Sequence, residues 1–371
     1  MKTPTVKLSR RKLLIQGSLA LGSMGLGLGL PAATFASRKT TVKVGVLAPS
    51  HCALPMINAD LTGSYREHGL KVEVVFARTM PEIAKGIFSG ELHFGQLMVP
   101  MTIAAHLGIG PFAGIHQPLV SPMWAGTNGG AMVVRKDSGI RTPSHLKGKT
   151  IGVHSRLMFH YLITMELLER YQLKTNEDVR IKVIDMNDLI NALKSGEIDA
   201  FVNPEPLSSA AVAKEFARDF LLTKDLWYRH PCCNLTALRS FYEMEPDIFR
   251  SFTTATMKSA LELNRTGERE ERLKTIWEQS PPYQELPLKV IQKAFTPGRT
   301  DFEPFPYQSS INVMIKLLQK SGLYPPAKTA EETAAEIFLS GYAREILHSL
   351  GQLRVPDSDN REETVVGKVY G

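Results

Sequence analysis

The chain has 371 residues, of which 43% are hydrophobic and 22% are charged, and its formal net charge is +7. This length suffices for two α/β lobes with separate cores, and the composition is that of an ordinary globular protein. The first 36 residues hold five basic residues and no acidic one, so 39 basic and 37 acidic residues follow them, a net charge of +2. The positive charge therefore does not predict a nucleic-acid partner.

Residues 1–36 have the three parts of an export signal. Residues 9–14, Ser-Arg-Arg-Lys-Leu-Leu, form a twin-arginine pattern, an apolar glycine-rich run covers 15–30, and small residues precede Ala36. We expect cleavage after Ala36 and delivery to the periplasm by the twin-arginine pathway. A membrane anchor is the alternative, but the run is short for a bilayer and its glycines weaken it as a helix.

Short β-rich runs alternate with helical segments from residue 41 on, which is typical of α/β lobes. In the first group, strands are expected at 42–47, 72–76, 92–98 and 112–116, and helices at 56–67 and 81–88. After a connecting strand at 131–135, strands are expected at 150–153, 181–184, 198–202 and 221–223, and helices at 159–171 and 187–194. A strand at 234–239 returns the chain to the first group, and the sequence from 247 on is mostly helical.

This order predicts an α/β fold with two lobes, two crossing strands and a ligand cleft between the lobes. Ligands of open α/β sheets bind at the carboxyl ends of strands, so we expect the two sheets to face each other across that cleft. The predicted boundaries are 1–36 for the signal, 40–130 and 233–350 for lobe 1, 131–232 for lobe 2 and 351–371 for a loose tail.

Several segments resemble a known family. Residues 131–140 (AMVVRKDSGI), 145–152 (HLKGKTIG) and 193–206 (LKSGEIDAFVNPEP) look like the lobe-crossing region of type II periplasmic solute-binding proteins. Within that superfamily, the chain is most similar to the nitrate/bicarbonate type, with sulfonate and taurine binders as relatives, at residues 96–101 (QLMVPM), 227–231 (WYRHP) and 306–310 (PYQSS).

The resemblance implies a periplasmic, monomeric component of an ABC importer that captures a small anion or compact organic solute by lobe closure. Its partners would be that small molecule and the permease subunits in the inner membrane, with no nucleic acid and no cofactor. We expect no enzymatic activity, since hydrolase, phosphate-loop and dinucleotide motifs are absent from the sequence. The main alternative on the same fold is an enzyme like the pyrimidine synthases of thiamine biosynthesis.

Ten side chains are predicted to contact the ligand, because they follow strands or match positions of the family. His160 matches the histidine that donates to the bound anion, Met80 stands where the family has a tryptophan, and Cys233 replaces a Lys or Glu that distinguishes ligands. The full set is His51, Cys52, Met80, Gln96, Asn128, Ser155, His160, Asn203, Glu205 and Cys233.

The three cysteines, Cys52, Cys232 and Cys233, leave three interpretations open. They are buried small hydrophobes, or Cys52 pairs with one of the other two, or Cys52 and Cys233 form a soft site with His51 and His160 for a metal ion or a metal-bearing ligand. The sequence has no Cys-x-x-Cys or His-x-x-x-His spacing, so no structural zinc site is predicted.

Overall fold

The first sheet combines three parallel strands with three antiparallel ones. The structure, a computed structural model, describes residues 41–325 and 328–370, so the predicted export signal lies outside the described residues. The strands are β1 (Val42–Leu47), β2 (Val72–Ala77), β3 (Phe94–Met98), β4 (Leu119–Asn128), β10 (Pro231–Leu238) and β11 (Thr300–Asp301). Their order is β11-β4-β10-β3-β1-β2, with β1, β2 and β3 parallel to one another. The strands β3 and β4 are buried along their whole length, as expected for a sheet covered on both faces.

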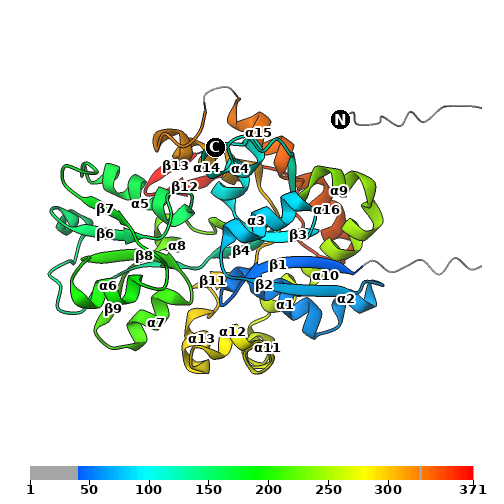
Figure 1. Cartoon of the computed structure of the whole chain (residues 1–371), viewed down its shortest axis with the longest axis horizontal. Coiled ribbons are helices and arrows are strands. Elements are labelled where there is room, and N and C mark those ends of the chain that lie inside the picture. Colours follow the sequence, from blue (N-terminus) through cyan, green and yellow to red (C-terminus); the bar gives the residue numbers. More distant parts are fainter. Residues whose placement is uncertain (1–40, 326–327, 371) are drawn as a thin grey trace, which may run out of the picture. The chain divides into compact units, whose positions relative to one another are not determined.

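Helices connect these strands and cover the sheet (Figure 1). They are η1 (His51–Ala53), α1 (Leu54–Leu61), α2 (Ser64–Glu67), α3 (Met80–Ser89), α4 (Val99–Leu107) and η2 (Gly110–Phe112). Local sequence sets the ends of α3: the Thr79 hydroxyl accepts a hydrogen bond from the Glu82 amide, Pro81 lies in the first turn, and Gly90 ends the helix at φ 75°.

The second sheet has the order β7-β6-β8-β5-β9. Its strands are β5 (Gly130–Arg135), β6 (Thr150–Val153), β7 (Arg180–Val183), β8 (Ala200–Pro204) and β9 (Ala217–Leu222). The associated helices are η3 (Pro143–Leu146), α5 (Phe159–Arg170), α6 (Leu189–Ser195), α7 (Leu207–Ala213) and α8 (Thr223–Leu226). The strands β6, β7 and β8 are parallel, so their carboxyl ends lie at one edge.

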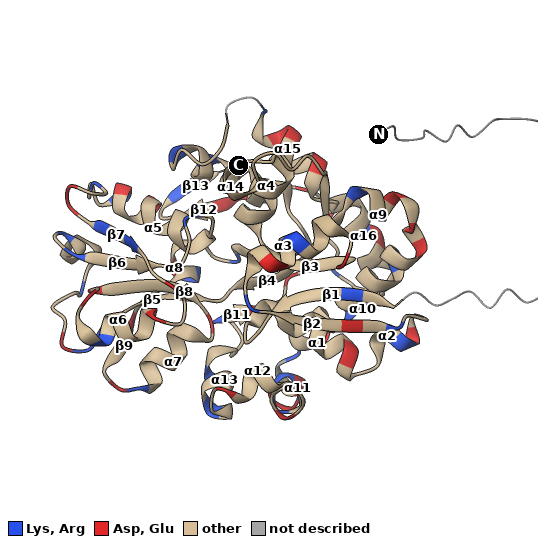
Figure 2. Ribbon diagram, in the orientation of Figure 1, with Lys and Arg blue, Asp and Glu red and all other residues tan. Residues whose placement is uncertain are grey.

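The remainder of the chain is mainly helical, as the sequence predicts. It contains α9 (Arg239–Met244), α10 (Pro246–Leu263), α11 (Thr266–Gln279), α12 (Pro281–Gln284), α13 (Leu288–Ala294), α14 (Gln308–Lys320), α15 (Ala330–Ile337) and α16 (Ser340–Ser349), followed by β12 (Glu363–Val365) and β13 (Lys368–Tyr370). Figure 2 shows Lys and Arg interspersed with Asp and Glu over the outer helices and loops, in keeping with the small net charge beyond the first 36 residues.

The chain passes between the two sheets twice. Gly129 separates β4 of the first sheet from β5 of the second, and residues 223–230 separate β9 from β10. Arg299, just before β11, also joins the two parts, because its guanidinium bonds the carboxylates of Glu205 and Asp219 in the second part. The lobe boundaries at 130/131 and 232/233 stay a prediction.

The strand predicted at 112–116 is wrong. Residues 110–112 form η2, and the strand that follows is β4, ten residues long and interrupted in sequence by Pro122. A proline inside a central strand argues against such an assignment, but here the pairing of β4 with β10 shifts register between Leu235 and Ala237, opposite Pro122. The bulge removes the need for the proline to donate a ladder hydrogen bond.

The tail after residue 350, predicted to be loose, ends in the β12–β13 hairpin. The buried carboxylate of Glu363 accepts hydrogen bonds from Trp227 Nε1 at 2.8 Å, from Ser309 Oγ at 3.3 Å and from Arg361 Nε at 2.8 Å. Lys368 adds an ion pair of 2.8 Å to Glu166 on α5. Composition alone made the tail look unstructured, because its contacts are with residues far away in the sequence.

Replacing Glu363 tests whether this hairpin stabilises the fold. Glu363→Ala leaves the Trp227 N–H and the Ser309 hydroxyl buried without an acceptor, so we expect the free energy of unfolding to fall by about 3 kcal/mol. Urea denaturation measures the change. The exposed neighbour Glu362→Ala is the control, expected to change it by about 0.5 kcal/mol or less. Equal effects of the two substitutions would contradict a structural role for the hairpin.

Candidate functional site

Two pairs of residues lie at the carboxyl-terminal edge of the first sheet. His51 and Cys52 follow β1 in η1, and Cys232 and Cys233 lie at the start of β10. Cys233 is opposite Met98, the last residue of β3, and β3 is parallel to β1. The two pairs therefore share one edge of the sheet, although 180 residues of chain separate them.

A bulge at the start of β10 changes how its two cysteines are oriented. Neighbouring residues of a regular strand point to opposite faces of the sheet. Here Pro231 is opposite Thr127 and Cys233 is opposite Gly126, so two steps along β10 match one step along β4. The extra residue, Cys232, is released from strict alternation and turns toward η1.

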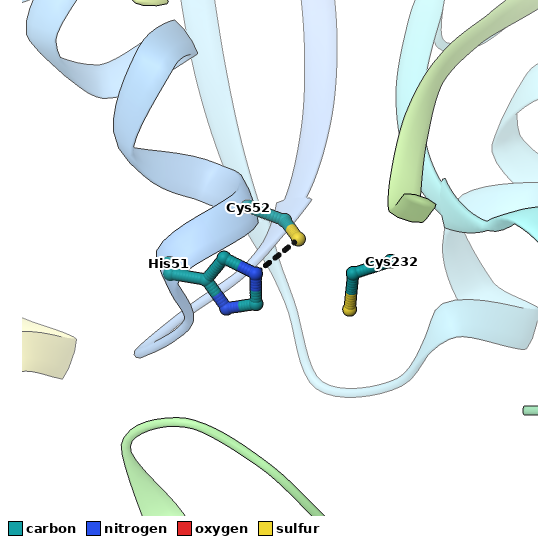
Figure 3. A group of neighbouring side chains, drawn as sticks. All are labelled: His51, Cys52 and Cys232. Carbon is teal, nitrogen blue, oxygen red and sulfur yellow. Dashed lines mark hydrogen bonds between the residues drawn. The ribbon is translucent and has the colours of Figure 1, made fainter. Parts of the chain in front are cut away.

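The side chains of His51, Cys52 and Cys232 form what we call the thiol–imidazole cluster (Figure 3). Their donor atoms all lie within 4.8 Å of one another, and Nε2 of His51 is 3.2 Å from Sγ of Cys52. Beside it, Gln96 Nε2 donates to Sγ of Cys233 at 3.6 Å. All three cysteines are buried and free in the structure, so Cys52 is not paired with either of the others.

The second sheet presents polar side chains from its own carboxyl edge. His154 follows β6, Asn203 lies near the end of β8, and His160 is in the first turn of α5. Nδ1 of His154 lies 2.7 Å from Oδ1 of Asn203. His160 and Asn203 are fully buried. These groups belong to the second sheet, and the connection from β4 to β5 joins that sheet to the first one, where the thiol–imidazole cluster lies.

Gly129 and Gly130 lie where the chain crosses from β4 to β5, a connection that we call the crossing strand. Both glycines are packed against imidazole rings. A Cβ atom on Gly129 would lie 2.4 Å from Cε1 of His51, and a Cβ atom on Gly130 would lie 2.1 Å from Nε2 of His160. No side chain fits at either position without displacing a ring. Two successive residues thus contact one buried histidine from each half of the molecule, His51 from the half built on the first sheet and His160 from the half built on the second.

Burial holds the histidines of this region neutral. Desolvation lowers the pKa of His51 to about 4 and that of His230 to about 3. Desolvation also lowers the pKa of His160, and electrostatic repulsion from His230 and His154 lowers it further. Desolvation raises the pKa of the Cys52 thiol. At neutral pH the imidazoles therefore each offer one N–H donor and one lone pair.

Several of these buried polar atoms have no hydrogen-bond partner among the described residues. They are Nδ1 of His51, both ring nitrogens of His160, Nδ1 of His230 and Nδ2 of Asn203. Buried polar groups in folded proteins are nearly always paired, since an unpaired one costs roughly 1–3 kcal/mol. These atoms come from both sheets, which makes them candidates for contacts with a bound species.

The structure brings six of the ten predicted ligand contacts to this region. His51, Cys52, Gln96 and Cys233 belong to the edge of the first sheet, and His160 and Asn203 to the second. As ligand contacts, all ten remain predictions.

The other four predicted residues use their polar atoms elsewhere or pack in the core. Glu205 pairs with Arg299 and accepts from the Ser209 amide, and Asn128 donates to Asp301 at 2.8 Å. Met80 is buried at the start of α3, and the Ser155 hydroxyl accepts from the Leu157 amide at 3.1 Å.

Three residues of the region were not among the predicted contacts: Cys232, His154 and His230. In a regular strand Cys232 and Cys233 point to opposite faces of the sheet, so a prediction that places Cys233 in the site leaves Cys232 out. The bulge at Cys232 removes this restriction. His230 stacks on Phe159 with ring centroids 3.8 Å apart, and its Nε2 lies 2.9 Å from Thr223 Oγ1. The signal available in the sequence was the adjacent His-Pro-Cys-Cys run at the return strand.

A comparison with family models gives a match over residues 36–277, to a family described as NMT1-like. The chain belongs to the NMT1-like family. Among curated proteins, it is 24% identical over 286 residues to a nitrate import ATP-binding protein, NrtC, of Synechococcus elongatus. That alignment covers 72% of the chain and 42% of NrtC, so the chain spans less than half the length of this relative.

Solved structures show the same fold at low sequence identity. The periplasmic nitrate-binding protein NrtA of Synechocystis has a TM-score of 0.80 at 17% identity, covering 90% of this chain and 96% of NrtA. The aliphatic sulphonate binding protein SsuA of Escherichia coli gives 0.63 at 18%, covering 79% and 91%. The desulfurization enzyme DSZB gives 0.56 at 14%, covering 83% and 99%. The chain therefore has the α/β fold of periplasmic binding proteins, as predicted from the sequence.

Adding a methyl group at Gly130 tests the packing at the crossing strand. Gly130→Ala places a Cβ against His160, and we expect a loss of about 2 kcal/mol in the free energy of unfolding. Gly139→Ala, where the Cβ meets no atom within 4 Å, is the matched control and should lose nothing. Adding His160→Ala to Gly130→Ala should restore part of the loss. A double variant that shows no such coupling in urea denaturation would contradict the contact.

The lowered pKa of His230 predicts a pH-dependent stability. Between about pH 3 and 6.5 the unfolded chain binds a proton at this residue that the folded chain does not, so acidification destabilises the fold. Relative to His230→Gln, the native chain should lose about 2 kcal/mol more between pH 7 and pH 5. Urea denaturation at several pH values measures this difference. Parallel pH profiles for the two proteins would show that His230 is not held neutral.

Proposed function

We propose that this chain is the solute-binding component of an ABC importer, holding a small polar solute between its two sheets and delivering it to a permease. One observation carries the proposal: buried polar atoms without partners come from both halves and lie on either side of the crossing strand. The fold shared with nitrate- and sulphonate-binding proteins supports it.

The same arrangement suggests how capture works. The polar groups of His51 belong to the first half and those of His160 and Asn203 to the second, so they complete one site only when the halves are closed. A solute that satisfies donors from both halves binds the closed form better than the open form and shifts the equilibrium toward closure. Delivery then follows when the permease favours the open form.

The twin-arginine signal in residues 1–36 supports export to the periplasm, with cleavage after Ala36 and an inner-membrane permease as partner of a monomer. Among the described residues, no helix combines the length and apolar character needed to cross a bilayer. The lobes would be residues 40–130 with 233–350, and 131–232.

Binding without turnover is the expected behaviour, although the desulfurization enzyme DSZB has a similar fold. The imidazoles and thiols here include nucleophilic groups, and all of them are buried.

Thermal shift measurements on the purified chain test this function. Nitrate, bicarbonate, alkanesulfonates and a thiamine precursor are the first candidates, together with extracts of co-purifying small molecules. A solute present at a hundred times its dissociation constant should stabilise the fold by about 2.7 kcal/mol. It should also be recovered unchanged, whereas chemical conversion would overturn the binding function.

The matched pair of variants is His160→Ala and His348→Ala. We expect His160→Ala to lose the ligand-induced shift in melting temperature. His348→Ala should keep it, because His348 lies on the surface of α16. An undiminished shift in the His160→Ala variant would show that the ligand binds elsewhere on the protein.

A further inference from the structure

We propose that the solute is a soft d10 metal ion, bound by the imidazole of His51 and the thiols of Cys52 and Cys232. This inference rests on the proposed function, because it names the cargo of the same site. Nothing in the fold itself requires such a donor set, and the three residues come from two distant segments of the chain.

The spacing of the donors suits one metal ion. Sulfur lies about 2.3 Å and imidazole nitrogen about 2.0 Å from Zn²⁺, so ligands of one ion lie roughly 3.5–4 Å apart. The Nε2–Sγ separation of 3.2 Å between His51 and Cys52 is close to that value, and all three donors lie within 4.8 Å. Figure 3 shows Cys232 across from His51 and Cys52, and we expect its thiol to complete the coordination.

The surroundings favour a metal ion over water or an anion. Thiol and imidazole ligands select soft ions such as Cu⁺ and Zn²⁺, whereas hard ions prefer oxygen ligands. Phe295 lies beside the His51 ring, at 6.5 Å between centroids, and Tyr283 packs against Phe295. This apolar wall excludes water and strengthens coordination.

Two backbone features hold the donors in place. A Cβ on Gly126 would lie 2.8 Å from Sγ of Cys52 and 2.8 Å from Cδ2 of His51, so this glycine leaves just enough room for both side chains. The bulge in β10 turns Cys232 toward them. A larger residue at position 126 would push His51 and Cys52 aside, and regular pairing of β10 would turn Cys232 away from them.

Three protein donors match the low coordination number that Cu⁺ accepts, while Zn²⁺ prefers a fourth ligand. Cys233, whose sulfur accepts a hydrogen bond from Gln96 Nε2, follows Cys232 directly and is available as a fourth ligand. Closure over the ion gives the second half a reason to carry unpartnered imidazole nitrogen atoms.

Binding is a proton exchange without electron transfer. Each thiol that coordinates gives its proton to solvent as the sulfur–metal bond forms, so one ion releases up to two protons from Cys52 and Cys232. Two thiolates balance the charge of a divalent ion and one balances that of Cu⁺, which suits a buried site.

The test uses the purified, chelator-treated chain under nitrogen, titrated with Cu⁺ in competition with a chromophoric chelator, and separately with Zn²⁺, Cd²⁺ and Mg²⁺. We expect one equivalent of Cu⁺ to bind, protons to be released into weakly buffered solution, and Cd²⁺ to give a sulfur-to-metal absorption band. Mg²⁺ should not bind. Cys52→Ser, Cys232→Ser and His51→Gln should each weaken Cu⁺ binding by about 100-fold or more.

Ser259→Ala, a buried polar change that removes the hydrogen bond to Asn58, controls for general destabilisation and should leave Cu⁺ affinity unchanged. Circular dichroism verifies that each variant is folded, and the cadmium band, which needs sulfur ligands, reports on the site independently of stability. Undiminished Cu⁺ binding in both cysteine variants would overturn the proposal.

The remaining outcomes separate this inference from the function on which it rests. If the chain binds an anion or an organic solute with closure of its halves but no soft metal ion, the inference is wrong and the solute-binding function stands. If Cu⁺ binds at the cluster but small-angle scattering shows no closure, the ion is not the cargo and the inference fails as stated.

Discussion

The chain crosses from the first sheet to the second through a glycine backbone that lies against two buried imidazole rings, and this contact governs the arrangement of the site. Gly129 and Gly130 carry the chain from one sheet to the other, with His51 packed against the first and His160 against the second. Each ring comes from a different half, so the position of the strand fixes both at once. Any residue with a side chain would push one ring away and separate the groups that meet there.

Around this strand, polar groups are buried at a free-energy cost that no described partner offsets. Beside it, Arg299 forms ion pairs with Glu205 and Asp219 that connect the two halves. Glu205 and Asn128 were predicted to bind ligand but hold this framework instead of presenting free atoms to a solute. The site therefore consists of groups that are unpaired and of others that keep them in position.

Most of the strand and helix order follows from the sequence, since alternation and capping residues such as Thr79 and Gly90 act locally. The positions of His51, Cys52 and His160 were also predictable, because residues after strands and at helix starts gather at sheet edges. Cys232 was not, since its orientation depends on a bulge that arises from pairing with β4. The strand β4 was misplaced for the same reason, as Pro122 is tolerated only at an irregular pairing. Long-range contacts such as those of Glu363 leave no local pattern to read.

The carboxy-terminal hairpin also bears on motion. Glu363 is fastened to Trp227 and α14, while Lys368 reaches Glu166 on α5, which Lys320 of α14 contacts as well. Ion pairs thus join α5 of the second half to α14 and to the carboxy-terminal hairpin. Separation of the halves has to break these ion pairs or move the hairpin together with α5, so residues 363–368 help set how readily the molecule opens when nothing is bound.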